Sequence, residues 1–332
     1  MKIIIDAFGG DNAPLCVLQG ARAAIDEYGV EIMLCGDEQK IKKCAEDNGI
    51  DMSGMEIKHA DDVMDMHDEP NSILKSKSNT SMAVGLKALS ENEGDAFVSA
   101  GSTGAVLVGA TFIAKRIKGI KRPAIGTIMP GTDKPYLLID AGANINCRSD
   151  MLMQFATLGS VYMNRFLGIE NPTVGLLNNG AEDSKGGDVL VETYAMLKES
   201  NLNFIGNVEA RDVPKGACDV LVADGFAGNI VLKLTEGLAS AFMGMFKETL
   251  MSSFVTKIAG LIIKPKLKNQ MKKLDYSEYG GAPIIGVRKP VIKAHGSSNA
   301  KAFKNAIRQA KLIVESKVIE GMNEAVEAMK ED

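Results

Sequence analysis

The apolar positions of the chain group into short runs, and each run leads through a polar, glycine-containing turn into a longer helical stretch. The runs are rich in β-branched residues, which favours strands. We expect strands at residues 2–6, 31–36, 95–100, 135–141, 173–178, 218–225 and 290–294. We expect helices at 15–28, 37–48, 149–167 and 188–200, one ending near 115, one from 230 onward, and one from the 295–301 turn to the C-terminus. Strand and helix therefore alternate along the chain.

This alternation predicts an α/β fold with a mostly parallel sheet that is covered by helices on both faces. The strands are continuously apolar, as expected where both faces are buried. In such sheets the turns at the carboxyl ends of the strands line the ligand crevice, so we expect six glycine-rich turns to converge on one rim. No low-complexity linker divides residues 1–332, which favours a single domain, or two lobes that share one sheet.

One segment, at about residues 240–280, departs from this rhythm. Between Thr249 and Leu274 there are six lysines and no acidic residue, with apolar residues in the first half and basic residues in the second. We expect a helical excursion whose apolar face enters a lipid interface and whose lysines meet anionic headgroups. The expected membrane contacts are Phe254, Ile258, Leu261, Ile262, Lys264, Lys266 and Lys268. The alternative is an ordinary basic helix pair packed on a dimer.

Composition argues against several classes of function. The net charge is −4, tryptophan is absent and aromatic residues make up 5%, which disfavours a general nucleic-acid binder. Five scattered cysteines without a CxxC pair predict neither disulfides nor a zinc site, and free thiols suit a reducing cytoplasm. The N-terminal apolar run is too short for a signal peptide. No window offers about 18 uninterrupted apolar residues, so we expect a cytoplasmic protein without a spanning helix.

The glycine-rich turns suit close approach of an anion to the backbone. Glycine gives a ligand access to backbone N–H groups, and the following helix adds unpaired donors and the positive end of its dipole. No GxGxxG follows a strand and no P-loop sequence occurs, so the known dinucleotide and nucleotide sites are not indicated. For any single turn, the alternative is ordinary strand-to-helix turn chemistry. The candidate residues for binding substrate or phosphate are Gly9, Gly10, Asp11, Asn12, Gly101, Ser102, Thr103, Gly104, Asp140, Asn144, Asn178, Gly186, Asp224, Gly225, Gly228, Gly296 and Ser297.

Individual side chains in these turns leave alternatives open. Ser102 and Thr103 can cap a helix or contact an anion. Asp140 lies among amides, and one carboxylate in such a group is a weak magnesium site, so we expect no metal. Lys185 either stays solvated or contacts an oxyanion, and Asn229 is divided between structure and binding in the same way.

His295 raises the question of nucleophilic catalysis, because Ser297 follows it closely in "KAHGSSNAK". A serine nucleophile needs a base within reach and a third group that orients the base. GxSxG is absent, and no orienting acid is identifiable. We therefore expect His295 to contact an anion or carbonyl group, and the alternative is a structural histidine bonded to neighbouring backbone.

Taken together, the turns resemble those of a known family. The segments are "IDAFGGDNAP", "FVSAGSTGA", "DAGANINC", "GLLNNGAEDSKG", "ADGFAGNIVLK", "YGGAP" and "KAHGSSNAKAFKNAIRQA". In this order, from about residue 1 to 315, they resemble the bacterial acyl-acyl-carrier-protein–phosphate acyltransferases of phospholipid synthesis. Departures are small: family members often carry Asn at Ser102, Met at Phe8 and Val at Ala227, and Ser102 retains the ability to form hydrogen bonds.

The resemblance implies a three-layer α/β/α fold similar to phosphate acetyltransferases and isocitrate dehydrogenase-like enzymes, and a homodimer. It also implies a reaction without a cofactor, in which an acyl carrier protein thioester and inorganic phosphate give an acyl phosphate and free carrier protein. Phosphate is itself the nucleophile, so the site needs to position a dianion and stabilise charge on the thioester oxygen. Backbone donors, Lys185, Asn229 and His295 are the groups expected to do this.

The sequence is compatible with three alternative functions. A phosphate acetyltransferase-like enzyme would use coenzyme A thioesters, and a dehydrogenase of the same fold would need a nicotinamide site. A non-catalytic membrane-surface scaffold would use the basic apolar segment but leave the polar turns without a purpose. For an acyltransferase, membrane attachment would bring the acyl phosphate to a membrane glycerol-phosphate acyltransferase, and the same lysines are an alternative docking site for the acidic acyl carrier protein.

Overall fold

One sheet of eleven strands organises the chain. The computed structural model describes residues 1–263 and 280–329. The strands are β1 (Lys2–Asp6), β2 (Glu31–Gly36), β3 (Met55–His59), β4 (Ala96–Ser99), β5 (Ala124–Met129), β6 (Tyr136–Ile139), β7 (Thr173–Asn178), β8 (Asn203–Glu209), β9 (Val220–Val222), β10 (Ala282–Ile285) and β11 (Val291–Lys293). The α-helices are α1 (Leu15–Tyr28), α2 (Glu38–Asp47), α3 (Ser81–Ser90), α4 (Thr103–Phe112), α5 (Ser149–Leu167), α6 (Asp188–Glu199), α7 (Gly225–Met251), α9 (Ala300–Glu315) and α10 (Val318–Ala328), and the short 3-10 helices are η1 (Pro70–Leu74) and η2 (Val213–Lys215).

The sheet is mostly parallel, but its two halves run in opposite directions. The strand order is β3-β2-β1-β4-β11-β10-β5-β6-β9-β7-β8. Seven of the ten strand pairs in the described ranges are parallel, and the three antiparallel pairs (β11–β10, β10–β5 and β5–β6) lie in the middle. The glycine-rich turns therefore fall into two groups, one from each half, rather than on the one rim that a uniformly parallel sheet would have.

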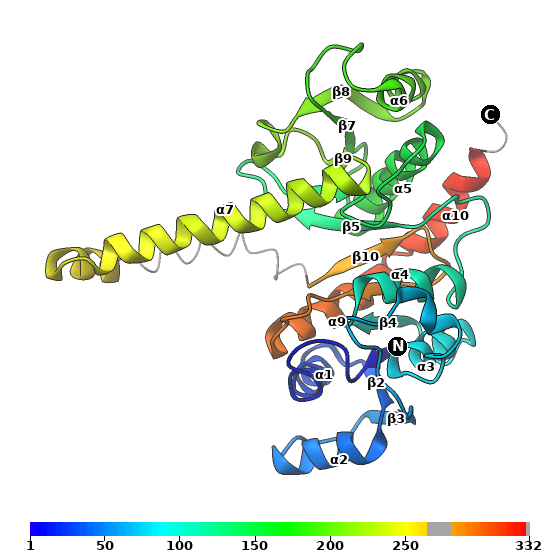
Figure 1. The fold of residues 1–332 in the computed structure, drawn as a ribbon, viewed down its shortest axis with the longest axis vertical. Coiled ribbons are helices and arrows are strands. Elements are labelled where there is room, and N and C mark those ends of the chain that lie inside the picture. Colours follow the sequence, from blue (N-terminus) through cyan, green and yellow to red (C-terminus); the bar gives the residue numbers. More distant parts are fainter. Residues whose placement is uncertain (264–279, 330–332) are drawn as a thin grey trace.

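Apolar side chains on both faces of the sheet explain the continuously apolar strands. In β1, Ile3 and Ile5 contribute to one core and Ile4 to the other, since successive residues of a strand point to opposite faces. One core packs against α1, α5, α9 and α10, and the other against α3, α4 and the start of α7. Figure 1 shows the sheet running between these helices. This is the predicted three-layer α/β/α arrangement.

Local signals place most helix ends where the sequence predicts them. The predicted bounds of α1 and α5 agree with the structure, and both helices end at a glycine with positive φ, Gly29 at 63° and Gly168 at 71°. α7 begins earlier than predicted, at Gly225 rather than at residue 230. The reason is a cap: the Asp224 carboxylate accepts a hydrogen bond from the Ala227 backbone N–H at 2.7 Å, so the expected turn "FAGN" is the first helical turn.

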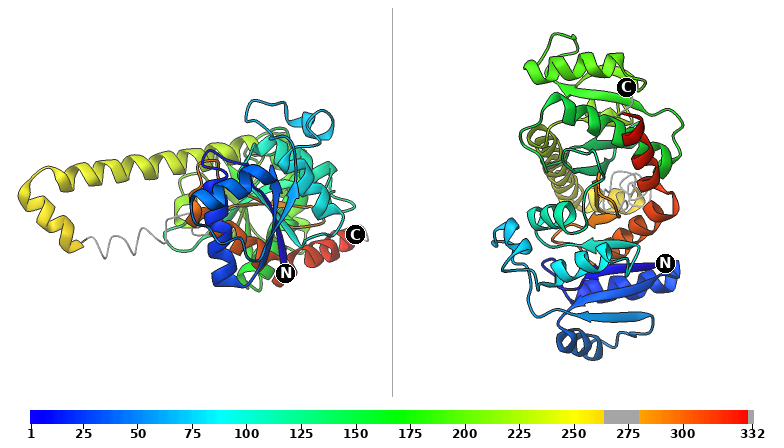
Figure 2. Two further views of the ribbon diagram at one scale, coloured as in Figure 1. Left: turned by 90° about the horizontal axis from the view of Figure 1, so that it is seen from below. Right: turned by 90° about the vertical axis from the view of Figure 1, so that its right-hand side faces the viewer.

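α7 projects far from the sheet (Figures 1 and 2), and a second helical stretch at residues 254–263 follows it. Only Gly225 and Gly228 of α7 are buried. The predicted lipid contacts Phe254, Ile258, Leu261 and Ile262 are exposed on the second stretch. The predicted contacts Lys264, Lys266 and Lys268 lie outside the described residues. In the described part of the chain, no helix has the length and apolar character needed to cross a membrane.

Candidate functional site

Three turns from the first half of the sheet, β1–α1, β4–α4 and β11–α9, meet through backbone contacts. The Asp11 backbone N–H donates to the Gly296 carbonyl oxygen at 2.8 Å. The Asn12 side-chain amide donates to the Ser298 carbonyl oxygen at 3.3 Å. A side chain at Gly10, where φ is +103°, would press on Ala100 and on the Gly296 carbonyl. These predicted residues are therefore brought together, although residues 1–12 and 296–298 are far apart in the chain.

Asp6 holds the base of this group. Its carboxylate accepts hydrogen bonds from the Ser81 hydroxyl at 2.6 Å and from the Ser99 hydroxyl at 2.7 Å. Burial raises the pKa of Asp6, and the two hydroxyls oppose that rise because they bond the charged form. The backbone N–H of Gly101 donates to the Ser99 oxygen at 3.0 Å, and a Cβ on Gly9 would lie 2.7 Å from that N–H group. Gly9 therefore allows the first two turns to touch.

The second group consists of the β6–α5 and β9–α7 turns, and Asp140 organises it. The buried carboxylate of Asp140 accepts hydrogen bonds from the backbone N–H groups of Ile125, Gly142, Ala143 and Asn144 and from the Asn144 side-chain amide, at 2.7–3.1 Å. Asn144 also accepts from the Gly225 backbone N–H at 2.7 Å. These oxygens are already occupied, so the predicted residues Asp140 and Asn144 shape the turn from below, and direct contact with substrate stays a prediction.

Two further predicted glycines, Gly104 and Gly228, allow close packing. A Cβ on Gly104 would lie 2.7 Å from Pro70 of η1, and a Cβ on Gly228 would overlap the carbonyl oxygen of Asp140. Gly228 thus lets the first turn of α7 rest directly on the β6–α5 turn. The sequence indicated both glycines as possible anion contacts, and in the structure both pack against protein atoms.

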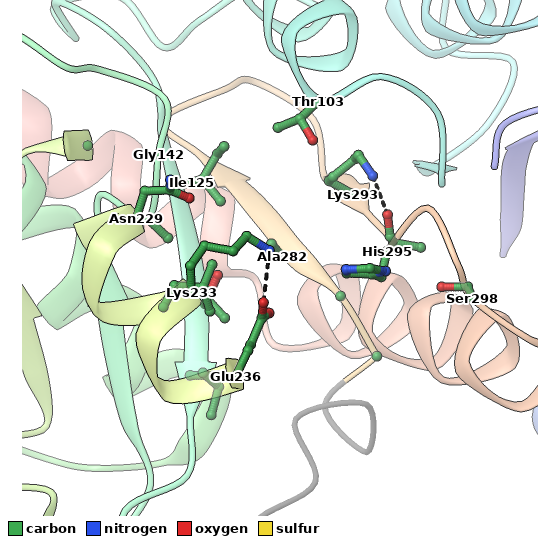
Figure 3. A pocket seen from close by; sticks show the side chains of 18 of the residues that line it. Thr103, Ile125, Gly142, Asn229, Lys233, Glu236, Ala282, Lys293, His295 and Ser298 are labelled. Atoms are coloured by element: carbon green, nitrogen blue, oxygen red, sulfur yellow. Dashed lines mark hydrogen bonds and ion pairs between the residues drawn. The ribbon is translucent and has the colours of Figure 1, made fainter. Parts of the chain in front are cut away.

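A pocket of about 430 Å³ opens between the two groups of turns (Figure 3). Its polar lining includes Thr103, Asn229, Lys293, His295 and Ser298, and its apolar lining includes Ile125, Ile128, Ile145, Phe226 and Leu232. Of the predicted site residues, Thr103, Gly225, Asn229 and His295 line this pocket. Volumes of this size are typical of small-molecule sites that combine an apolar wall with a few polar groups.

His295 is exposed to the pocket and held by its own turn. The Ser297 backbone N–H lies 3.2 Å from Nδ1 and the Ser297 hydroxyl lies 2.9 Å from it. A backbone N–H can only donate, so Nδ1 is the acceptor and the neutral ring carries its hydrogen on Nε2. In the described ranges no carboxylate bonds this ring, so the arrangement lacks the orienting acid of a serine triad. His295 therefore presents a hydrogen-bond donor to the pocket.

Asn229 comes from the first turns of α7, opposite His295. Its side chain lies against Gly142, where an added Cβ would be 3.3 Å from the Asn229 amide oxygen. One turn further along α7, Lys233 pairs with Glu236 at 2.8 Å, and both line the outer part of the pocket (Figure 3). The Asn229 amide has no hydrogen-bond partner in the ranges that the structure describes, so both its donor and its acceptor remain available.

Lys293 is a pocket residue that sequence reasoning missed, as it also missed Lys233, Glu236 and Ser298. It is the last residue of β11 and is only 9% exposed. Its Nζ donates to the Ala100 carbonyl oxygen at 3.3 Å and to the Ala294 carbonyl oxygen. Burial lowers the pKa of Lys293 to about 8, although Asp6 and Asp11 oppose that change. The signal was present in the sequence, because a lysine inside the apolar run "PVIKA" is out of place in a strand that is buried on both faces.

Lys185 and Gly186, on the β7–α6 loop, and Asn178, the last residue of β7, do not line the pocket. Lys185 is about half exposed, and its Nζ is 4.0 Å from Glu182. The Asn178 amide donates to the Lys185 carbonyl oxygen at 3.0 Å, which closes the loop on itself. Lys185 is not part of the pocket lining to which Asn229 and His295 belong. Gly186, at φ +89°, turns the chain before α6 begins.

The next question is whether the described residues could bind a metal ion. In residues 1–263 and 280–329 the structure contains no cluster of three or more His, Cys, Asp or Glu side chains that could hold a metal ion. The buried carboxylates Asp6 and Asp140 both accept hydrogen bonds from protein donors. The expectation of a metal-free site stays a prediction.

The comparisons with known proteins agree with this geometry. The family model described as "Fatty acid synthesis protein" matches residues 1–321. The phosphate acyltransferase of Thermoanaerobacterium thermosaccharolyticum is 44% identical over 332 residues, which cover 100% of this chain and 98% of that protein. The phosphate acyltransferase of Dictyoglomus turgidum is 46% identical over 329 residues, 97% of this chain and 98% of that protein.

Among solved structures, the EutD phosphotransacetylase from Staphylococcus aureus has a TM-score of 0.62 at 18% identity and covers 96% of this chain and 94% of that one. This likeness confirms the predicted phosphate acetyltransferase-like α/β fold. The family match extends over nearly the whole chain, through both groups of turns that line the pocket. The chain therefore belongs to the phosphate acyltransferase family of fatty acid synthesis proteins.

Proposed function

We propose that this protein transfers an acyl group from an acyl carrier protein thioester to inorganic phosphate, which yields an acyl phosphate and free carrier protein. A phosphate oxygen forms a bond to the thioester carbonyl carbon, the C–S bond breaks, and sulfur leaves with the electron pair as a thiolate. The family supports acyl transfer to phosphate, and the resemblance of the turns supports the carrier protein as the donor.

One observation supports this proposal above the others: the pocket has a polar wall and an apolar wall. Polar groups from both halves of the sheet face apolar side chains within one space of about 430 Å³. Inorganic phosphate requires the first kind of wall and an acyl chain requires the second. Ile125, Ile128 and Phe226 offer the acyl chain an apolar surface next to the polar turns.

His295 and Asn229 act as donors in the proposed reaction. The Nε2–H of His295 and the amide N–H of Asn229 stabilise negative charge as it develops on the thioester oxygen. A thiol of pKa about 8.5 leaves readily, so strong general-acid assistance is not needed. Phosphate supplies the nucleophile, and Ser297 then has a local role in holding the histidine ring. Lys185 lies outside the pocket, so it is proposed as a contact for phosphate on its way into the site and not at the reacting atoms.

Trapping the product tests the function. Purified protein should convert acyl carrier protein thioester and phosphate into an acyl phosphate, which hydroxylamine captures as a hydroxamate. Asn229→Ala should lower this rate about 100-fold or more if its amide meets the developing oxyanion, while Asn323→Ala, exposed on α10, serves as the matched control. Absence of hydroxamate with wild-type protein would contradict the proposal.

The carrier is decided by running acyl carrier protein and acyl-coenzyme A thioesters side by side. Higher kcat/KM with the carrier protein is expected, and preference for coenzyme A would assign the chain to phosphate acetyltransferase-like chemistry.

A separate test concerns the need for a metal ion. Activity should persist in excess chelator. Loss of activity that magnesium restores would overturn the metal-free mechanism.

We further propose that the exposed apolar stripe of α7 pairs with a second copy of the chain. Leu234, Leu238, Phe242 and Phe246 follow one another at helical spacing and are 48–59% exposed. Contiguous apolar surface on a projecting helix is typical of an interaction site. Sedimentation should show a homodimer, and Phe242→Glu should yield monomers. A wild-type monomer at micromolar concentration would refute this.

The second helical stretch, residues 254–263, is proposed to give peripheral attachment of a cytoplasmic protein to anionic membrane. Leu261 and Ile262 are 69% and 73% exposed at the far end of the projection. Vesicles containing anionic lipid should carry the protein in flotation at low salt, and Ile262→Asp should abolish this while Leu312→Asp, exposed on α9, should not. Failure of the wild-type protein to float would remove the membrane assignment.

A further inference from the structure

Lys293 is a buried, positively charged side chain that lines the pocket and has no role in the reaction as proposed. Its ammonium group has three hydrogens to donate, and two of them meet the carbonyl oxygens of Ala100 and Ala294. In the described residues it forms no ion pair with a carboxylate. Charged groups are rarely this buried without a counter-charge. One of its three N–H groups is therefore free to donate a hydrogen bond into the pocket that Lys293 lines.

Two carboxylates, Asp6 and Asp11, favour the charged form of Lys293 from nearby, but in the described residues neither forms an ion pair with it. Asp6, on β1, is engaged by two serine hydroxyls at 2.6 Å and 2.7 Å. Asp11 is exposed in the next turn, and Lys233 faces from α7, where Glu236 pairs with it. The nearby α4 and β4 carry no charged residue, because their sequences are TGAVLVGATF and AFVS.

The start of α4 adds donors at the same place. Thr103 lines the pocket with Lys293, and Figure 3 shows both on one side of it with Asn229 on the other. Ser102 is the N-cap of this ten-residue helix, but its side chain makes no capping hydrogen bond. The N–H groups of the first helical turn have no partner within the helix. An ammonium and free backbone N–H groups together are the kind of site that binds a small oxyanion.

We infer that Lys293 and the first turn of α4 bind the attacking phosphate, while the thioester lies across the pocket at Asn229 and Phe226. This assignment rests on the proposed function and adds the direction of the reaction: the phosphate oxygen approaches the carbonyl carbon from the β11–α4 side. Lys293 keeps its proton throughout and acts as the counter-charge of the phosphate dianion. The thiolate departs toward the outer part of the pocket, where the carrier protein must dock.

Phosphate binding tests this assignment without the acyl substrate. Equilibrium dialysis with radiolabelled inorganic phosphate should show weaker binding by Lys293→Met, by about 10- to 100-fold, because a charge-assisted contact is lost. Lys87→Met removes a lysine that is 70% exposed on α3 and should bind phosphate like the wild type. Asn229→Ala should keep its phosphate affinity within about threefold and lose turnover instead. Equal phosphate affinity in wild type and Lys293→Met would overturn the assignment, as would weak binding by Asn229→Ala alone.

A second measurement covers the case in which Lys293→Met does not fold. With wild-type protein, the phosphate dissociation constant should rise as pH increases through about 8, where burial places the pKa of Lys293. The sign follows from the charge: the protonated ammonium binds the dianion, and the neutral amine does not. A dissociation constant that stays flat up to pH about 9.5 would contradict the role of Lys293. Dialysis also separates this inference from the proposed function, because phosphate can bind even where no acyl phosphate forms.

Discussion

Replacing Lys293 by methionine should change how the free energy of unfolding depends on pH. The pKa of Lys293 falls from 10.5 to about 8 on folding, because burial disfavours its charged form. Below pH about 8 the lysine is protonated in both states, and its burial costs stability in full. Between about 8 and 10.5 the unfolded chain binds more protons than the folded chain, so stability rises with pH. Above that window both states are neutral and the cost is gone.

The magnitude follows from the size of the shift. One pKa unit corresponds to about 1.4 kcal/mol, so the full effect is about 3 kcal/mol for a residue that is only 9% exposed. Between pH 7 and 9.5 about 2 kcal/mol of this should be recovered by the wild type. Lys293→Met has no titrating group at the position and should lack this gain. The prediction concerns the difference between two proteins, so the titration of other lysines and tyrosines cancels.

Urea unfolding of wild type, Lys293→Met and the surface control Lys87→Met measures the effect. The curves are recorded at pH 7, 8, 9 and 9.5, roughly spanning the expected window. Wild type and the control should gain stability relative to Lys293→Met as pH rises. If the difference between wild type and Lys293→Met stays constant within about 0.5 kcal/mol, Lys293 is not a buried, charged group at neutral pH, and the reasoning fails.

Three further predictions concern the surrounding turns. His295→Ala should lower turnover by about 100-fold, because a donor to the developing oxyanion is lost, whereas Ser297→Ala should retain appreciable activity; an acyl ester isolated on Ser297 would refute this division of roles. Gly228→Ala should destabilise the protein by about 1–3 kcal/mol, since the new methyl group meets backbone, while Gly237→Ala, with no neighbour within 4 Å, should stabilise α7 by up to about 1 kcal/mol; equal melting temperatures would argue against the close contact. Lys185→Ala should slow acyl phosphate formation without altering thermal unfolding, because its side chain is 47% exposed; unchanged rates would remove it from the catalytic set.

Much of the fold can be read from the sequence because the signals are local. The apolar period and the glycine ends place α1 and α5, and the continuously apolar runs predict a sheet buried on both faces. Strands β3, β5, β8 and β10 were not predicted. For β5 and β10 this mattered, since their antiparallel pairing reverses half of the sheet. Strand direction depends on which segments pair, and pairing partners lie far apart in the chain.

The candidate site shows the same division. Sequence reasoning selected His295, Asn229 and Thr103, which the structure gathers around one pocket. It also selected Lys185, which lies outside that pocket, and passed over Lys293. The sequence of a glycine-rich turn does not show whether its backbone N–H groups bind a ligand or a carboxylate of the protein. Around Asp140 they bind the carboxylate.

The sequence by itself determined the α/β alternation, the positions of most turns and the family, because these depend on local periodicity, turn chemistry and motif order. The tertiary structure decided which turns share a pocket, which carboxylates are already satisfied, and that Lys293 is a buried cation facing an apolar wall. The physical reason is that burial and charge compensation are properties of a residue's neighbours in space. For Lys293 those neighbours are Asp6, Ala100 and α4, which the chain brings to β11 from about 190 to 290 residues earlier.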